Sequence, residues 1–110
     1  MERRTVHSFG DDALGDSDAV DLVQRLRAGE VSAQEVAEAA IARAERVNLQ
    51  INAVELACYG RGRAEAATPR DGYFSGVPTF VKDNTDVAGL PTNHGSNAVN
   101  AAPAQEDDPF

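Results

Sequence analysis

The sequence predicts an α/β fold in which a helical hairpin precedes the first strands of a sheet. Two stretches between residues 17 and 47 repeat apolar residues at three- and four-residue spacing, which is the period of an amphipathic helix. Two later stretches, residues 51–56 and 76–82, are apolar and partly alternating, as strands are. The order of these patterns places the helices before the strands.

The first helix is predicted near residues 17–28. Asp16, Ser17 or Asp18 could cap its amino end, because short polar side chains accept hydrogen bonds from the unpaired N–H groups there. Gly29 follows the last apolar repeat and is predicted to end the helix in the left-handed conformation that glycine adopts easily.

The second helix is predicted to begin at "SAQE", residues 32–35, which is a capping box, and to run to about Val47. Val36 and several alanines share one stripe of this helix, and small alanines allow close approach to a neighbour. The two helices are therefore expected to pack as a hairpin. Core scaffolding is favoured over a partner-binding role for both.

The first strand is predicted at "INAVEL", residues 51–56, and the second at residues 76–82, with Pro78 near its start or at an edge. The stretch "YGRGRAEAATPR" between them, residues 59–70, has two glycines and then alanines and is consistent with a short helix or an irregular connector. Residues 83–96 are rich in Asp, Asn, Gly, Pro and Thr, which indicates turns.

Composition divides the chain into two parts. Residues 1–15 are acidic and contain glycine, which predicts a flexible arm, and residues 16–110 form the rest. Near the carboxyl end, Asp107 or Asp108 could cap a further helix with Pro109 in its first turn. A helix that is signalled at this position and not delivered suggests that the chain has been cut short.

The charge balance excludes some classes of partner. The chain has 18 acidic and 10 basic residues and a formal net charge of −8, which argues against unassisted binding to nucleic acid or to anionic membranes. The amino-terminal segment has no apolar run and is not a secretory signal. One cysteine, Cys58, cannot form an internal disulfide, so a cytoplasmic protein is expected. Cys58 is predicted to be a small buried or half-buried side chain and not a nucleophile.

Lys82 is the only lysine of a chain that has nine arginines. It ends the predicted strand at residues 76–82 and precedes the turn-rich region, and sites in open α/β sheets lie beyond the carboxyl ends of strands. An exposed structural lysine is the commoner outcome for such a residue.

The stretch "GVPTFVKDNTDVAGLPTNHGS", residues 76–96, resembles the first motif of the amidase signature family, in which a Gly-Val/Ile-Pro strand carries an invariant lysine followed by Asp-Asn. "LRAGEVSAQEVAEAAIARAERVN" and "INAV" resemble the helical hairpin and first strand before that motif, so the resemblance runs from about residue 17 to residue 110. It implies the front part of an amidase-signature mixed-sheet fold, incomplete in this chain.

The resemblance also implies a Ser-cisSer-Lys mechanism in which Lys82 is the catalytic base. In the family the lysine acts through a bridging serine on a nucleophilic serine, which attacks a carboxylic amide. Arginine cannot do this because guanidinium stays charged, whereas burial can neutralise an ammonium group. Lowering the pKa of a lysine from 10.4 to near 7 requires about 4–5 kcal/mol of differential stabilisation. No cofactor and no metal are implied, and the substrate is expected to be a small-molecule amide.

The sequence around Lys82 also offers other arrangements. Asp83 or Asp86 could hold the lysine charged in a plain ion pair, above all in the isolated chain, but Asp83 is expected to bond backbone N–H groups of the turn instead. His94 and Ser96 are too close in a loop to make an aligned Ser–His pair. His94 with His7 matches no metal-ligand spacing.

The chain departs from the family in one respect. Its serines, Ser8, Ser17, Ser32, Ser75 and Ser96, lie in no Gly-Gly-Ser-Ser context, so the two catalytic serines are missing and the chain alone is expected to be inactive. Later strands of the sheet would also come from other sequence, which leaves apolar faces exposed. Two alternatives remain: a non-catalytic helical binding module, and the amidase-like subunit of a tRNA-dependent amidotransferase. Substrate identity and oligomeric state stay open.

Overall fold

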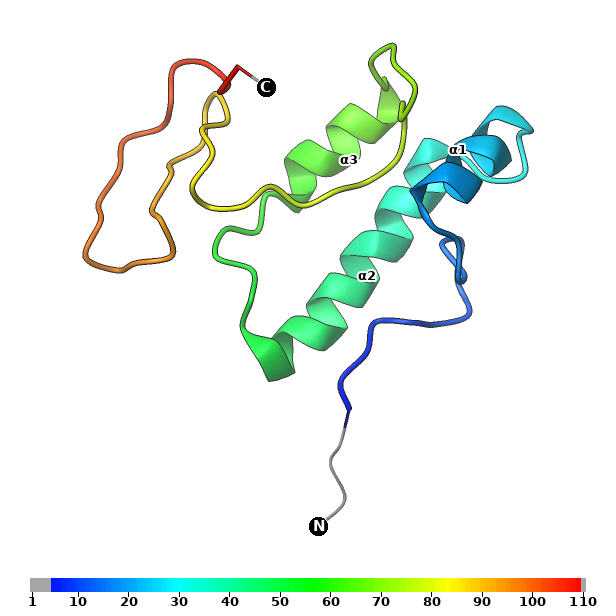
Figure 1. Ribbon diagram of the computed structural model, residues 1–110, viewed down its shortest axis with the longest axis horizontal. Helices are drawn as coiled ribbons and strands as arrows, with labels where there is room; N and C mark the ends of the chain where they lie inside the picture. Colours follow the sequence, from blue (N-terminus) through cyan, green and yellow to red (C-terminus); the bar gives the residue numbers. More distant parts are fainter. Residues whose placement is uncertain (1–4, 110) are drawn as a thin grey trace. The chain divides into compact units, whose positions relative to one another are not determined.

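The structure, a computed structural model, describes residues 5–109, so Met1 to Arg4 of the predicted arm and Phe110 lie outside it. The chain divides into one unit that ends at Pro78 and a second that starts at Thr79. Three helices lie in the first unit, and the second consists of turns and irregular chain (Figure 1). Within residues 5–109 there is no β-strand, and the only pairings of strand type are two isolated bridges.

Helix α1 spans Ala19–Arg27 and begins and ends as its sequence predicts. Asp18 is the N-cap, and its carboxylate accepts a hydrogen bond from the N–H of Asp21. Gly29 has φ +73°. The N–H of Glu30 donates to the carbonyl of Arg25, and the N–H of Gly29 donates to the carbonyl of Leu26. These two hydrogen bonds form a Schellman motif. Both predicted end signals are confirmed.

Helix α2 spans Ala33–Ile51 and starts at the predicted capping box. The Glu35 carboxylate accepts a hydrogen bond from the N–H of Ser32, and the Ser32 hydroxyl oxygen accepts one from the N–H of Glu35. It continues four residues past the predicted end at Val47. Asn52 ends the helix with φ 48°, and the Asn48 side-chain oxygen accepts hydrogen bonds from the N–H groups of residues 53 and 54. The predicted strand at residues 51–56 is therefore wrong, because its first residue belongs to the helix and these local bonds use the N–H groups that a ladder needs.

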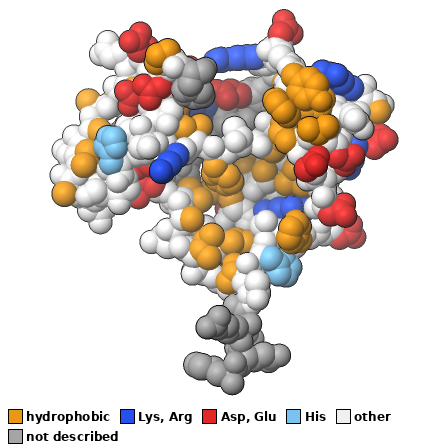
Figure 2. All heavy atoms as spheres, in the orientation of Figure 1, with side chains coloured by type: hydrophobic (Ala, Val, Ile, Leu, Met, Phe, Trp, Pro, Cys, Tyr) orange, Lys and Arg blue, Asp and Glu red, His pale blue; other side chains and the backbone are white. Residues whose placement is uncertain are grey.

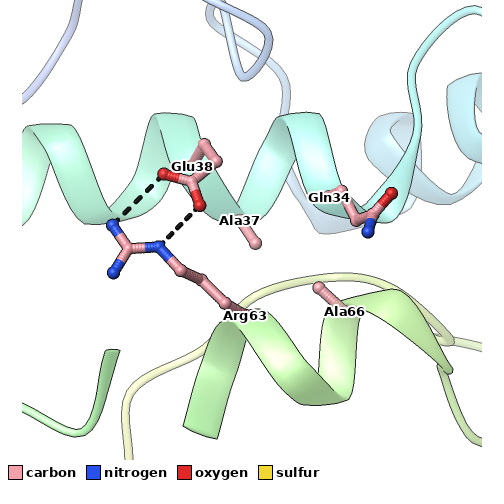
Figure 3. Close-up of a pocket in the computed structure, with 5 residues that line it drawn as sticks. All are labelled: Gln34, Ala37, Glu38, Arg63 and Ala66. Atoms are coloured by element: carbon pink, nitrogen blue, oxygen red, sulfur yellow. Dashed lines mark hydrogen bonds and ion pairs between the residues drawn. The ribbon is translucent and has the colours of Figure 1, made fainter. Parts of the chain in front are cut away.

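Helix α3 spans Tyr59–Ala67 and lies along α2, so the stretch left open between helix and connector is a helix. Arg63 of α3 donates to both carboxylate oxygens of Glu38 on α2, with N–O distances of 2.6 and 3.3 Å. These residues border a shallow cavity of about 80 Å³ between the two helices (Figure 3). Among the described helices, α2 has its most extensive contacts with α3. The predicted hairpin of the first two helices is not confirmed.

The core of the first unit is small. Its buried apolar side chains come from α1 and the first half of α2 and are Leu22, Val23, Val36, Ala37, Ala39 and Ile41. Only Val36 is completely enclosed. Such a core supplies limited hydrophobic stabilisation, as expected for an alanine-rich chain.

Residues 8–15 are held to α2 by two arginines. Arg43 forms a two-pronged ion pair with Asp12, with N–O distances of 2.6 and 2.7 Å, and also donates to the carbonyl of Gly15. Arg46 donates to the carbonyl of Ser8. Arg43 lowers the pKa of the Asp12 carboxyl, chiefly through the hydrogen bonds between the two side chains, and Asp12 in turn raises the pKa of Arg43.

The segment before the lysine turns against the first two helices. Gly76 has φ +85°, and a Cβ atom at this position would lie 3.0 Å from the Cβ of Ala33. The guanidinium carbon of Arg27 lies 4.9 Å from the centre of the Tyr73 ring. Residues 73–76 form turns, and the predicted strand at residues 76–82 is wrong, because no other described segment pairs with its backbone.

Many large apolar side chains remain at the surface, as the space-filling view shows (Figure 2). Leu49 is 90% exposed, Phe80 68% and Phe74 54%. This agrees with the expectation that apolar faces stay uncovered in this chain. None of the described helices combines the length and apolar character that crossing a membrane requires.

Candidate active-site segment around Lys82

Lys82 opens a turn at the start of the second unit. Its carbonyl oxygen accepts a hydrogen bond from the N–H of Thr85 at 3.1 Å. Its side chain is exposed. The turn places Lys82, Asp83 and Asn84 at the beginning of an irregular region that doubles back on itself (Figure 1, yellow to red).

Asp83 binds the backbone of a second turn ten residues later. Its two carboxylate oxygens accept hydrogen bonds from the N–H groups of Asn93 and Gly95, each at 2.9 Å. These donors lower the pKa of the Asp83 carboxyl, the one from Gly95 most, and the nearby His94 acts in the same direction. The prediction that Asp83 bonds backbone N–H groups of the turn is confirmed.

The loop that Asp83 holds is itself ordered by local hydrogen bonds. The N–H of Ser96 donates to the carbonyl of Asn93 at 3.0 Å, and the Asn93 side chain accepts from the N–H of Ala101 at 3.3 Å. His94 and Gly95 both have positive φ, 53° and 64°. His94 therefore lies in a backbone conformation that residues with a Cβ atom rarely adopt.

A second contact joins the same two parts of the unit. The Thr92 hydroxyl donates to the Asp86 carboxylate at 2.6 Å. Together with Asp83, this gives two carboxylates that bind residues 92–95, one through backbone N–H groups and one through a side chain.

The carboxyl end of the chain closes the region. The side chains of Asp107 and Asp108 accept hydrogen bonds from the N–H groups of Ala88 and Asp86, both at 2.8 Å. Bridges also join Ala88 with Ala104 and Pro91 with Pro103. The two aspartates that the sequence offers as helix caps thus bond an earlier segment.

No ion pair joins Lys82 to Asp83 or Asp86 in the part of the chain that the structure describes, so the alternative of a plain ion pair is not observed. The oxygens of Asp83 are engaged with N–H donors, and Asp86 binds Thr92.

The other candidates from the sequence form no site in residues 5–109. The Ser96 hydroxyl oxygen accepts from the N–H of Ala98, and no hydrogen bond links Ser96 to His94. Cys58 is exposed, so the prediction of a buried or half-buried thiol is wrong. Its position between α2 and α3, outside the small core, explains the exposure. Among these residues no group of three His, Cys, Asp or Glu side chains could hold a metal ion.

The residues that shape this segment could not be recognised from the sequence. Thr92 and Asn93 bond residues six and eight positions away, and Asp107 and Asp108 bond residues 19 and 22 positions away. The density of Asp, Asn and Thr was the one available signal, since these side chains often bond nearby backbone groups.

Comparison with known protein families identifies the chain. The family model "Amidase" matches residues 35–110, which include both the lysine and the loop that Asp83 holds. No solved structure was found to match.

Several curated bacterial proteins are similar to the chain. "Putative amidase AmiC" of Mycobacterium tuberculosis (strain ATCC 25618 / H37Rv) is 55% identical over 95 residues, which are 84% of this chain and 20% of that protein. The protein of the same name from Mycobacterium leprae (strain TN) is 50% identical over 105 residues, 96% of this chain and 22% of the relative. The 6-aminohexanoate-cyclic-dimer hydrolase of Paenarthrobacter ureafaciens is 39% identical over 71 residues, 64% of this chain and 14% of the relative.

The chain therefore spans about a fifth of the length of the mycobacterial relatives that it matches. The family match nevertheless covers well over half of this chain, and it includes the lysine segment. The chain belongs to the amidase family.

Proposed function

We propose that this chain supplies the general base of an amide-hydrolysing site and that Lys82 is that base. The proposal rests on one observation, the position of the only lysine inside the segment that matches the amidase family. Residues 16–110 would then be the amino-terminal part of an amidase domain. The names of the similar proteins, which are amidases and hydrolases, support a small-molecule carboxylic amide as the substrate.

The proposed reaction is an acyl transfer to a serine. Lys82 takes a proton through a bridging serine from the nucleophilic serine, whose oxygen attacks the amide carbonyl. The C–N bond breaks, ammonia or an amine leaves with a proton, and water hydrolyses the resulting ester to the acid. The serines belong to a glycine- and serine-rich segment that this sequence does not contain.

A base must release its proton, and this requirement decides how Lys82 has to be placed in the active state. The side chain is exposed in the structure, whereas a neutral lysine near pH 7 needs removal from water. We infer that further protein covers Lys82 when the site is complete. The exposed side chain of Phe80, two residues earlier, would be covered by the same contact. A single thiol agrees with a reducing cytoplasm, where we place the reaction.

Two substitutions test the assignment of Lys82. In the full-length gene product that contains this sequence, Lys82→Ala and Lys82→Arg should both lower kcat for amide hydrolysis by about 10²–10⁴-fold, the range for loss of a general base. Lys82→Arg is the decisive variant because it keeps the positive charge and cannot act as a base. Near-normal turnover by Lys82→Arg would show that position 82 supplies only charge.

A second test concerns the 110-residue chain by itself. It carries a proposed base and no serine in the required context, so we expect no amide hydrolysis above background. Sequencing the coding DNA beyond the codon for residue 110 should reveal a Gly-Gly-Ser-Ser-Gly stretch downstream. If the isolated chain hydrolysed an amide and Lys82→Ala abolished this activity, the proposal that the serines come from other sequence would be wrong.

A further inference from the structure

The residue that follows the lysine binds a loop that lies ten residues further along the chain. Asp83 accepts one hydrogen bond on each carboxylate oxygen, from the N–H groups of Asn93 and Gly95, both at 2.9 Å. Charge-assisted hydrogen bonds of this kind are stronger than neutral ones and fix direction as well as distance. Asp83 is therefore tied at two points to a turn of defined geometry.

The turn that Asp83 holds is connected further along the chain. Its own closing bond runs from Ser96 to Asn93, and Ala101 donates to the Asn93 side chain. On the other side, the carbonyl of Lys82 is held by the N–H of Thr85. The backbone at residues 82 and 83 is thus held from both directions by hydrogen bonds, while the Lys82 side chain remains exposed.

The geometry points to Asp83 as the positioning residue for Lys82: by fastening the turn at residues 93–96 to residue 83, it fixes the backbone from which the lysine side chain projects. This inference rests on the proposed function, because positioning matters to catalysis only if Lys82 is the base. It adds a role that the carboxylate performs without touching substrate.

The same bonds engage the carboxylate that lies next to the lysine in sequence. Both oxygens of Asp83 accept hydrogen bonds from backbone N–H groups, and Asp86 accepts one from the Thr92 hydroxyl. Among the described residues neither carboxylate forms an ion pair with Lys82. The hydrogen bonds of Asp83 are therefore directed to the turn and not to the lysine side chain.

Asp83→Asn is the informative variant. It keeps the size of the side chain but replaces one accepting oxygen with an N–H₂ group, which would face an N–H donor. One of the two hydrogen bonds of Asp83 is lost, and the new N–H₂ group points at a backbone N–H group that also needs an acceptor. The matched control is Glu106→Gln, which removes one negative charge from the same unit at an exposed side chain for which the structure shows no hydrogen bond or ion pair.

The first measurement is made on the 110-residue chain by NMR and does not depend on activity. In the wild type, the N–H resonances of Asn93 and Gly95 should titrate together at low pH, and Asp83→Asn should abolish this titration. The order parameter of the Lys82 N–H should fall in Asp83→Asn and stay unchanged in Glu106→Gln. Unchanged Lys82 dynamics in Asp83→Asn would overturn the positioning role.

The second measurement is made on the full-length gene product. A misplaced catalytic group costs up to about 10²-fold in rate, so Asp83→Asn should lower kcat by about 10–100-fold with KM changed less than about threefold. Glu106→Gln should leave both constants at the wild-type level. An unchanged kcat, or a loss of kcat that parallels a loss of circular dichroism signal, would overturn the inference in favour of a passive or purely structural carboxylate.

The two proposals fail in different ways. A wild-type gene product without amide hydrolysis overturns the proposed function and leaves the NMR result to decide whether Asp83 orders Lys82. An active wild type that loses activity in Lys82→Arg but not in Asp83→Asn keeps the proposed function and overturns the positioning role.

Discussion

Gly76 shows how one residue sets the path of the chain that leads to Lys82. Its φ of +85° is a conformation that costs residues with a Cβ atom about 1–2 kcal/mol, and the added methyl group would lie 3.0 Å from the Cβ of Ala33. We expect Gly76→Ala to lower the free energy of unfolding by at least about 1 kcal/mol. Urea denaturation followed by circular dichroism measures this change.

Gly62 is the matched control for that experiment. It lies inside helix α3, and nothing within 4 Å would touch an added Cβ atom. Gly62→Ala should raise the free energy of unfolding by about 0.5–1 kcal/mol, because alanine favours a helix and glycine does not. Equal effects of the two substitutions would show that φ at position 76 is not constrained.

At the same scale, the sequence determines the details that depend on near neighbours. Ser32 and Gly29 could be assigned, and Asp18 was one of three candidates, because a cap bonds backbone groups within one turn. Asn52 was missed because asparagine ends helices less often than glycine does. The contacts of Asp83 were foreseen as backbone bonds, but the partners, Asn93 and Gly95, could not be named from spacing alone.

At the scale of elements, the ion pair between Asp12 and Arg43 joins residues 8–15 to α2. The side chains are 25% and 12% exposed, and both carboxylate oxygens are bonded. We expect Asp12→Asn to lower the free energy of unfolding by about 1 kcal/mol at pH 7, a value that allows for solvent screening. Thermal unfolding followed by circular dichroism tests this.

The pH dependence of that stabilisation follows from its sign. Arg43 lowers the pKa of Asp12, so the folded chain binds this proton less readily than the unfolded chain does. The stabilisation is complete above the ordinary pKa of an aspartate and is lost as the pH falls through the lowered value. The difference between wild type and Asp12→Asn should therefore shrink at low pH. Glu38→Gln, which breaks a pair between more exposed side chains, should have a smaller effect at pH 7.

Elements that depend on local sequence signals could be predicted, and elements that depend on distant partners could not. Helices α1 and α2 have caps and periodic apolar residues, which a single sequence displays. The strands expected at residues 51–56 and 76–82 did not form, since a strand needs a partner and its apolar pattern cannot say whether one is present. The same limitation explains why the helix that pairs with α2 was not identified as α3.

At the scale of the whole molecule, burial is uneven between the two units. Every buried apolar side chain among the described residues lies between Leu22 and Ile41, and residues 79–109 contain none. Hydrogen exchange should therefore show stronger protection for amides near Val36 than for the amides of residues 79–109. Comparable protection in both units would mean that the second unit has a core of its own.

The candidate site could be found from sequence only as far as the lysine. Lys82 is identified by its solitary occurrence and by its motif, which a single chain displays directly. The loop that Asp83 and Asp86 hold depends on contacts that span up to a dozen residues, and the closing bonds of Asp107 and Asp108 span about twenty. Spacing rules do not reach that far.

The closing bonds have a consequence for shortened versions of this protein. Because Asp107 and Asp108 bind the backbone at residues 88 and 86, the segment that follows the lysine is held by side chains near the carboxyl end of the described residues. Removal of the last few residues, Asp107 and Asp108 among them, would free the N–H groups of Asp86 and Ala88 and loosen this part of the loop. Boundaries chosen for expression thus decide whether the motif keeps its shape, although none of the trimmed residues would be suspected from the motif itself.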